Sequence, residues 1–373
     1  MEGRATALFL FLCINSVMAR STPIPTFLTL IILTVFSACS KHAYPGSEKE
    51  TILYPSPPDT ARFQFLARYG ASTDFTGQQS KFKTFIAGKQ EVLPINKPYG
   101  ISLHQGKLYI VDPEIAGLEL IDFEENTFEY FHPSGRGRLL LPINCNFDMD
   151  GNLYISDVER EQVVIFDQDL KYSGEIGGEE NFKPTDVAIA GDTIFITDPR
   201  NNRINAYNRM SRKLLFSFPE NASAGDETWL YNPMNLYVAG GQVYVTDFGN
   251  SRVKIFNMNG TYLKSLGSYG RRPGQFVRPK GIAVDQDLNL FVVDAGFQNV
   301  QIFNKGGQLL MFMGGPYHGP GDMYLPANII VDYDHLSLFN KYVDPEYKLE
   351  YLIFVTNQYG PDKVNVYGKI KAK

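Results

Sequence analysis

The sequence predicts an all-β protein built from six similar sheets, and three observations support this fold class. A segment of about 45 residues occurs six times, and each copy begins with a proline. Each copy contains an apolar segment that ends in Asp or Asn, and then a second apolar segment. Turn residues such as Asp150-Gly151-Asn152 separate these segments. A fixed period of this length is typical of solenoids and propellers.

The repeated elements can be taken in order along each copy. The prolines lie 42 to 49 residues apart, at Pro98, Pro142, Pro184, Pro233, Pro279 and Pro326. The first apolar segments cover residues 108–112, 153–157, 194–198, 243–247, 290–294 and 353–357. The second segments cover residues 118–122, 163–167, 204–208, 253–257, 300–304 and 364–368. Alternating β-branched and aromatic residues in runs of this length predict strands.

Each copy therefore has room for four antiparallel strands. A small sheet with two apolar faces cannot shield both from water by itself, whereas six such sheets around an axis bury face against face. The sequence thus predicts a six-bladed β-propeller of four-stranded antiparallel blades. The sixth copy has no room for an outer strand, and residues 62–70 resemble the outer strands of other copies, such as residues 260–270. We therefore expect an N-terminal strand to close the last blade.

Composition limits the function classes. The chain has 373 residues, of which 44% are apolar and 20% charged, which is ordinary for a globular protein. We expect one propeller domain over residues 59–373. The net charge of −5 argues against a nucleic-acid partner, which would require a basic surface.

The N-terminal region predicts export and a lipid anchor. An apolar run leads directly into Ser37-Ala38-Cys39-Ser40, which resembles the lipobox of bacterial lipoproteins. We expect residues 1–39 to be the signal-peptide region, and we expect Met18 to be the true start of translation within it. Cys39 is expected to carry lipid, and residues 40–58 are expected to form a flexible tether. Ser40 after the cysteine favours the outer membrane under the sorting habit of that family. A membrane-spanning anchor is the alternative for the same apolar run.

The repeat itself resembles a known family. Pro-x-Gly-Ile at 98–101 and 279–282, with Gly-Asn-Ser-Arg-Val at 249–253, is similar to the NHL repeat. The resemblance covers roughly residues 60–370 and implies a six-bladed propeller. The phrase at residues 357–368 also resembles bacterial NHL lipoproteins found beside secreted multihaem cytochromes. This similarity implies a role in extracellular electron transfer or its assembly, with a multihaem cytochrome as the protein partner. The expected contact with the membrane is through the lipid anchor only.

The Asp that ends the first apolar segment recurs in nearly every copy. It lies at positions Asp112, Asp157, Asp198, Asp247 and Asp294. A residue repeated in every blade is more simply part of the architecture than of a catalytic site. We expect these carboxylates to accept backbone N–H groups, or to pair with an Arg as in Asp198/Arg203 and Asp247/Arg252.

A second recurring position lies two residues after each proline. It is occupied by Gly100, Asn144, Asp186, Asn235, Gly281 and Asn328. In a ring these residues converge at one mouth of the channel. The oxygens of Asn144, Asp186, Asn235 and Asn328 could hold Ca²⁺, as in related six-bladed lactonases. The favoured interpretation is that they are turn residues, because one anionic ligand is few for calcium.

Two segments depart from the repeat. Residues 334–350 are an insertion in the last copy, and residues 73–96 precede the first copy. Insertions on a rigid scaffold commonly carry recognition, which makes their aromatic residues candidates for partner contacts. The candidates are Phe339, Tyr342, Tyr347, Phe82 and Phe85. The alternative is that both segments pack on the propeller and cap it.

The sequence favours a non-enzymatic, lipid-anchored scaffold of the cell envelope that binds a protein partner through its faces and the two departing segments. No cofactor is predicted for the scaffold. The alternative is a Ca²⁺-dependent hydrolase or lactonase that uses the Asn/Asp cluster at the channel mouth.

Overall fold

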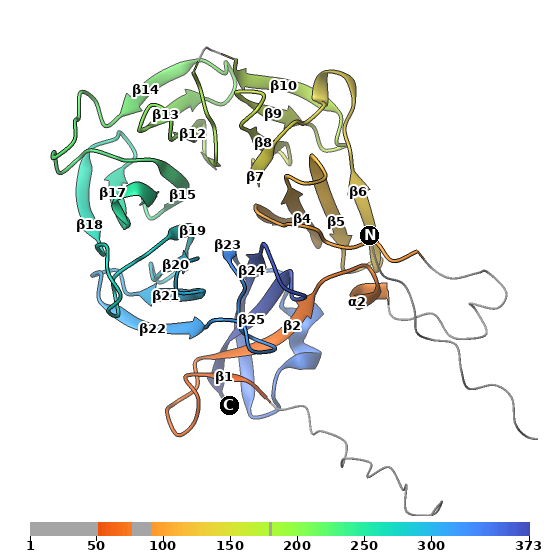
Figure 1. The fold of residues 1–373 in the computed structure, drawn as a ribbon. Helices are drawn as coiled ribbons and strands as arrows, with labels where there is room; N and C mark the ends of the chain where they lie inside the picture. Colours follow the sequence, from red (N-terminus) through yellow and green to blue (C-terminus); the bar gives the residue numbers. More distant parts are fainter. Residues whose placement is uncertain (1–50, 77–90, 179–180) are drawn as a thin grey trace, which may run out of the picture. The chain divides into compact units, whose positions relative to one another are not determined.

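The computed structural model describes residues 51–76, 91–178 and 181–373, which form a ring of six antiparallel sheets around a central axis (Figure 1). The predicted fold class is confirmed. The expected signal peptide, Cys39 and most of the tether lie outside the described residues, as do Phe82 and Phe85.

Blades 1 to 3 follow the first three prolines, and their strands run from the axis outward. Blade 1 consists of β3 (Ile101–His104), β4 (Lys107–Asp112), β5 (Gly117–Asp122) and β6 (Thr127–Phe131). Blade 2 consists of β7 (Pro142–Phe147), β8 (Leu153–Asp157), β9 (Gln162–Phe166) and β10 (Tyr172–Gly177). Blade 3 consists of β11 (Val187–Ala190), β12 (Thr193–Asp198), β13 (Arg203–Asn208) and β14 (Leu214–Phe218).

Blades 4 and 5 repeat this order, and blade 6 completes it with strands from both ends of the propeller. Blade 4 consists of β15 (Pro233–Ala239), β16 (Gln242–Asp247), β17 (Arg252–Asn257) and β18 (Tyr262–Leu266). Blade 5 consists of β19 (Pro279–Val284), β20 (Leu290–Asp294), β21 (Asn299–Phe303) and β22 (Leu309–Gly314). Blade 6 consists of β23 (Pro326–Asp332), β24 (Tyr347–Asn357), β25 (Val364–Ala372), β2 (Phe63–Tyr69) and β1 (Leu53–Tyr54).

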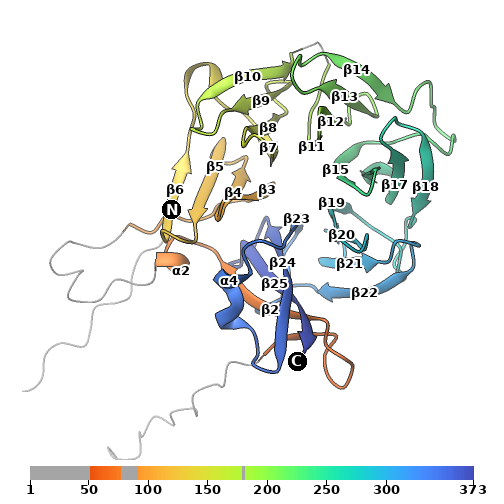
Figure 2. The same ribbon diagram turned by 180° about the vertical axis from the view of Figure 1, so that it is seen from behind.

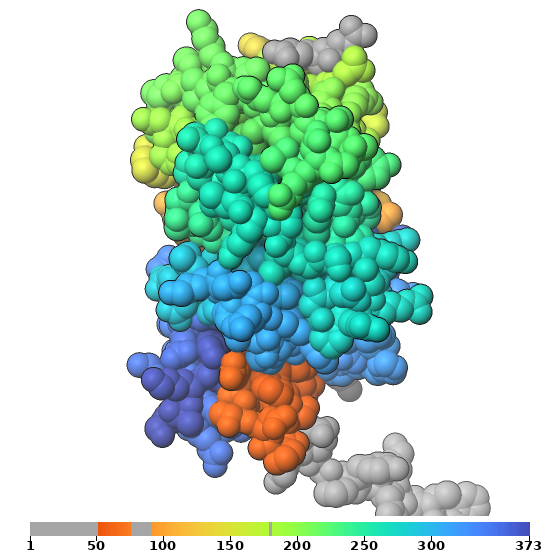
Figure 3. Space-filling view, turned by 90° about the vertical axis from the view of Figure 1, so that its left-hand side faces the viewer, coloured from red at the N-terminus to blue at the C-terminus, as the bar shows by residue number. Residues whose placement is uncertain are grey.

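The ring closes through β2, as the sequence predicts. Strand β2 pairs antiparallel with β25, with Phe63 opposite Lys369 and Tyr69 opposite Val364. Figure 3 shows the orange N-terminal segment of the propeller against the blue C-terminal segment. Pairing the outer edge of the last sheet removes an exposed strand edge without a disulfide.

Part of the expected tether packs on the propeller. Residues 53–54, which fall within the expected tether, form β1 and pair with β2. The Tyr54 hydroxyl donates to the carbonyl oxygen of Gly321 at 2.7 Å, and Leu53 packs against the apolar cluster between blades 6 and 1. These contacts fix a segment whose Pro- and Ser-rich composition favours a flexible chain.

The apolar core is divided among the contacts between neighbouring blades. One cluster joins Leu108 and Ile110 of blade 1 to Phe354 of blade 6, and equivalent clusters join the other neighbouring pairs. This arrangement buries the sheet faces that a single blade would expose, which is the reason the repeat requires a ring.

Helices are short and lie outside the sheets. They are α2 (Thr73–Thr76), η1 (Gly135–Gly137), η2 (Phe248–Asn250), α4 (Leu336–Phe339) and η3 (Asn340–Tyr342). Figure 2 shows α4 beside the strands of blade 6. Among the described residues, no helix has the length and apolar character needed to span a membrane.

The two faces of the ring carry different loops. On one face, which we call the proline face, the loops lead into the six prolines and the turns follow β4, β8, β12, β16, β20 and β24. On the other face, which we call the hairpin face, turns join the first strand of a blade to the second and the third to the fourth.

Candidate functional site

The four polar residues two positions after a proline come together on the axis. Asn144, Asp186, Asn235 and Asn328 have relative exposures of 4%, 5%, 1% and 5%. They are therefore buried inside the channel, and not displayed at an open mouth as the sequence suggested. The reason is that they hydrogen-bond to one another across the axis.

Asp186 is the centre of this group. Its Oδ1 accepts from Asn144 Nδ2 at 2.5 Å and from the Val187 N–H at 2.8 Å. Its Oδ2 accepts from Asn235 Nδ2 at 3.2 Å and from the Leu236 N–H at 2.9 Å. One carboxylate thereby joins blades 2, 3 and 4 through neutral donors.

The group extends to blade 6 across a blade that carries glycine. Asn328 Nδ2 donates to Asn144 Oδ1 at 3.0 Å, although Gly100 of blade 1 lies between their blades. A Cβ on Gly100 would lie 2.5 Å from Asn144 Cα and 2.7 Å from the Ile143 carbonyl oxygen. The absence of a side chain at Gly100 therefore allows the two amides to meet. We call Asn328, Asn144, Asp186 and Asn235 the axial belt.

A hydroxyl on the second strand supports each member of the axial belt. The backbone N–H of each belt residue donates to the hydroxyl at distances of 2.7 to 3.1 Å, in the pairs Asn144/Ser156, Asp186/Thr197, Asn235/Thr246 and Asn328/Thr356. The two blades with glycine at the belt position have Val111 and Val293 instead. Sequence reasoning missed this pairing, although a signal for it is present in the repeats. Copies with Asn or Asp at the belt position have Ser or Thr at the second position, and copies with Gly at the belt position have Val there.

Burial dominates the electrostatics of the axial belt. It raises the pKa of Asp186 to about 7, while the hydrogen bonds from Leu236, Val187, Asn235 and Asn144 partly oppose this change. Among the described residues, Asp186 forms no ion pair with a cation. The carboxylate is therefore held by dipoles alone, and it can take up a proton near neutral pH.

The axial belt does not fit a calcium ion. Ca²⁺ takes six to eight oxygen ligands, preferably with several carboxylates. Both Asp186 oxygens and Asn144 Oδ1 already accept two hydrogen bonds each within the protein. Within residues 51–76, 91–178 and 181–373, no three His, Cys, Asp or Glu side chains form a group that could hold a metal. Asn235 Oδ1 has no hydrogen-bond partner among the described residues, so a calcium ion would have to break the belt to gain more than this one ligand.

A cavity of about 180 Å³ adjoins the axial belt. Its lining includes Asn144, Asp186 and Asn328 at one end and Asp332 from the end of β23 at the other. The walls also include Ser102 and Tyr237. We call this space the axial cavity, and it extends from the belt towards the hairpin face.

The recurrent aspartates have the structural role that the sequence predicts. All five are fully buried, and Asp157 accepts from the N–H groups of Leu140 and Leu141 at 2.7 and 3.0 Å. Asp294 accepts from Val277 and Arg278 in the same way. The carboxylates thus hold the segment before each proline. The Arg pairs also form, with Asp247 and Arg252 at 3.0 Å and Asp198 and Arg203 at 3.5 Å.

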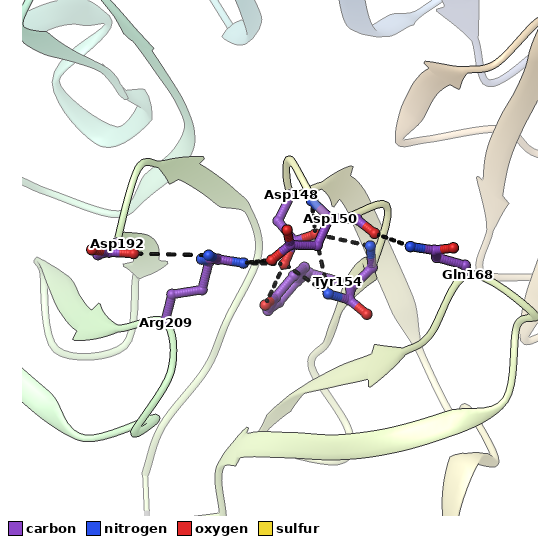
Figure 4. A network of polar contacts seen from close by, with 7 residues as sticks. Asp148, Asp150, Tyr154, Gln168, Asp192 and Arg209 are labelled. Atoms are coloured by element: carbon purple, nitrogen blue, oxygen red, sulfur yellow. Dashed lines mark hydrogen bonds and ion pairs between the residues drawn. The ribbon is translucent and has the colours of Figure 1, made fainter.

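A charged network on the hairpin face joins blades 2 and 3 (Figure 4). Arg209 bonds Asp148 Oδ2 at 3.1 Å, contacts Asp150, and lies 3.8 Å from Asp192. Asp148 also accepts from the Tyr154 hydroxyl at 3.1 Å. Although burial acts in the opposite direction, hydrogen bonds from Asn152, Arg209 and Tyr154 lower the pKa of Asp148. Arg209 carries one positive charge among three carboxylates, so this part of the face stays acidic.

The insertion at residues 334–350 packs on the propeller. Phe339 has 1% exposure and contacts Phe123 and Phe354, which removes it from any surface that a partner could reach. Tyr342 and Tyr347 are half-buried against the same apolar cluster. His335 fixes the insertion to blade 1, because its Nε2 accepts from the Gly106 N–H at 2.9 Å. These contacts support a capping role for the insertion.

Exposed aromatic side chains gather elsewhere, on the proline face. Tyr231, Tyr269, Tyr324 and Tyr359 have relative exposures of 49%, 73%, 47% and 47%. They lie in loops that lead into prolines, or in the turn after β24. Ring contacts join Tyr324 to Tyr359 at 5.9 Å and to Tyr317 at 6.4 Å. The sequence analysis did not select these residues, because spacing along the chain does not show which loops share a face.

Comparisons with known proteins support the fold. A sequence model of the family described as "6-bladed beta-propeller" matches residues 224–303. No curated protein sequence matches the chain.

Solved structures resemble the chain over most of its length. A streptogramin B lyase is 12% identical, with 74% of this chain and 84% of that chain covered and a TM-score of 0.51. A catalytically inactive virginiamycin B lyase from Staphylococcus aureus, solved with quinupristin, is 12% identical, with 73% and 94% covered and a TM-score of 0.51. A protein of unknown function from Bacteroides thetaiotaomicron is 14% identical, with 83% and 76% covered and a TM-score of 0.54. At these identities the likeness establishes a shared six-bladed propeller fold.

Proposed function

We propose that the chain is a lipid-anchored propeller of the bacterial outer membrane that binds a protein partner through its proline face. The observation that carries the proposal is the group of exposed aromatic side chains formed by Tyr231, Tyr269, Tyr324 and Tyr359. Aromatic residues are enriched where proteins contact one another, because each offers a large apolar area at a small cost in side-chain entropy.

The rigid ring favours recognition by loops. The repeat aspartates and the axial belt hold the start of each innermost strand, so the loops before the prolines are fixed at their inner ends. Residues positioned on a rigid scaffold can bind without a large loss of conformational entropy. The partner class that the NHL-lipoprotein resemblance implies is a secreted multihaem cytochrome.

Site-specific photo-crosslinking in intact cells tests the binding face. Tyr269 is replaced by benzoylphenylalanine, and the matched control replaces Met210, which is 75% exposed on the hairpin face. We expect a discrete crosslinked protein from position 269 and none from position 210. A Soret absorption band in the purified adduct would identify a haem protein. Equal crosslinking from the two positions would exclude the proline face as the binding surface.

The lipid anchor is tested separately. Labelling with radioactive palmitate is expected in the native chain and absent in Cys39→Ser. Fractionation of the two membranes should place the native chain in the outer membrane. Label retained by Cys39→Ser would rule out this anchor, whatever the crosslinking shows.

Calcium-dependent hydrolysis is the alternative that the sequence left open. The geometry does not favour it, because the oxygens of Asp186, Asn144 and Asn328 accept hydrogen bonds within the protein. Asn235 Oδ1 is the one belt oxygen without a partner among the described residues, and a single amide oxygen is far from the six to eight ligands that calcium takes. Calorimetric titration with calcium chloride decides the matter. We expect no heat of binding at millimolar calcium, and saturable binding that Asp186→Asn abolishes would favour the hydrolase.

A further inference from the structure

One end of the axial cavity carries the Asp186 carboxylate, and among the described residues no lysine or arginine lines the cavity. Asp186 lines the cavity and is 95% buried, and its four hydrogen-bond donors are neutral. A buried carboxylate without a cation is costly, and the cost falls when a positive charge is brought near it. This end of the cavity therefore attracts a cation.

The wall of the cavity offers hydroxyl groups that the protein itself does not use. Ser102 lines the cavity with 8% exposure, and the described residues provide no hydrogen-bond partner for its hydroxyl. The Tyr237 hydroxyl is in the same situation, and burial raises its pKa. Two hydroxyl groups without partners among the described residues, in this partly open cavity, leave a polar ligand or water to complete their hydrogen bonding.

The hairpin face towards which the cavity extends carries further carboxylates, of which Asp332 lines the cavity itself. The hairpin turns at the ends of the innermost strands carry Asp148, Asp150, Asp192, Asp285, Asp287 and Asp332. Arg209 compensates part of this charge in blades 2 and 3, and His335 bonds Asp332 at 2.9 Å. An excess of carboxylates on this face attracts cations and repels anions as they approach.

We propose that the axial cavity binds a small organic cation that carries a primary ammonium group and a hydroxyl group. Asp186 supplies the compensating charge, since the lone pairs of its oxygens already accept hydrogen bonds. The hydroxyls of Ser102 and Tyr237 accept hydrogen bonds from the ammonium or bond to the ligand hydroxyl. This site is separate from the proline face.

The size of the cavity limits the ligand. A cavity of about 150 Å³ holds a molecule of the size of benzene. The axial cavity, of about 180 Å³, therefore suits a ligand of a few heavy atoms. A bare metal ion is a poorer match, because the cavity lining lacks the several carboxylates that such ions prefer.

Binding should depend on pH through Asp186. The cation favours the ionised carboxylate, so binding should strengthen as the pH rises through about 7. Burial raises the pKa values of the neighbouring Tyr99 and Cys145 well above this range, so both remain neutral. The other titratable groups near the cavity are Tyr237, Asp332, His335 and His104. The Asp186→Asn variant keeps all of these groups, so its pH dependence measures their contribution to binding. The difference between the native chain and this variant is the contribution of Asp186.

Isothermal titration of the full chain in detergent with ethanolamine tests the proposal. Ethylene glycol and glycolate serve as neutral and anionic probes of similar size. We expect saturable ethanolamine binding at pH 8, weaker binding at pH 6, and no binding of the other two probes. Asp186→Asn should lower the affinity by at least about tenfold, as expected for the loss of a buried charge interaction. Asp226→Asn, on the exposed proline face, should leave it unchanged.

A second pair of variants covers the case in which Asp186→Asn does not fold. Ser102→Ala and Tyr237→Phe keep the carboxylate and each remove one unpartnered hydroxyl, so each should weaken ethanolamine binding severalfold. The proposal is overturned if ethanolamine does not bind, if ethylene glycol binds equally well, or if Ser102→Ala and Tyr237→Phe both bind like the native chain. The crosslinking experiment at position 269 is independent of this titration, so the two proposals can fail separately.

Discussion

Asn328 Nδ2 donates a hydrogen bond to Asn144 Oδ1 at 3.0 Å, although 184 residues separate the two positions. The bond passes over Gly100 and joins blade 6 to blade 2 at the axis. Strand β2 joins the two ends of the propeller at its circumference. The ring is therefore closed in two places by different means, a hydrogen-bonded amide pair inside and a paired strand outside.

Replacing Gly100 with alanine should destabilise the ring. The new Cβ would lie 2.5 Å from Asn144 Cα and 2.7 Å from the Ile143 carbonyl oxygen, both of which are too close. We expect a loss of about 1 to 3 kcal/mol in the free energy of unfolding, measured by guanidinium denaturation. Gly319→Ala is the control, because its Cβ would meet nothing within 4 Å. Equal stability of the two variants would show that the axial amides do not need this gap.

Asp186 should make stability fall as the pH rises. Its folded-state pKa of about 7 lies above the ordinary value near 3.8, so the folded state binds more protons between these values. The stabilisation is complete below about pH 4 and is lost as the pH rises through about 7. Because one pKa unit corresponds to about 1.4 kcal/mol, the effect is on the order of 4 kcal/mol.

The measurement compares denaturation curves of the native chain and Asp186→Asn between pH 4 and pH 8. The native chain should lose more stability over this range than the variant, since the amide does not titrate. Asp287→Asn removes an exposed carboxylate on the hairpin face and should retain the native pH profile. Parallel pH profiles for native chain and Asp186→Asn would mean that Asp186 is ionised throughout.

Removing a recurrent aspartate should lower the free energy of unfolding more than removing an exposed aspartate of the same blade. Asp294 accepts four backbone N–H groups, from Val277, Arg278, Gly296 and Phe297. Asp294→Ala leaves these donors without their acceptor, and we expect a loss of about 3 kcal/mol in unfolding free energy. Asp287→Ala should change stability little. Similar denaturation midpoints for the two variants would contradict the conclusion that Asp294 holds the segment before Pro279.

Much of the axial belt could be predicted from the repeat, but its bonding could not. The spacing after each proline identifies Asn144, Asp186, Asn235 and Asn328, because equivalent positions in a ring converge. It does not show that Asn144 would donate to Asp186 and accept from Asn328, since that depends on side-chain rotamers and on the gap above Gly100. Nor does the sequence show that Leu53–Tyr54 pairs with β2 at the edge of the last blade, because that position also depends on the distant contact of Tyr54 with Gly321.

By itself, the sequence determined the all-β class, the number of blades, the closing strand and the structural role of the recurrent aspartates. These features follow from period, alternation and local hydrogen bonding, which act over a few residues and repeat. Only the tertiary structure decided that Phe339 is buried, that Tyr231, Tyr269, Tyr324 and Tyr359 share a face, and that Asp186 lines a cavity on the axis. Such features depend on which distant segments become neighbours when the ring closes, and no local pattern encodes that.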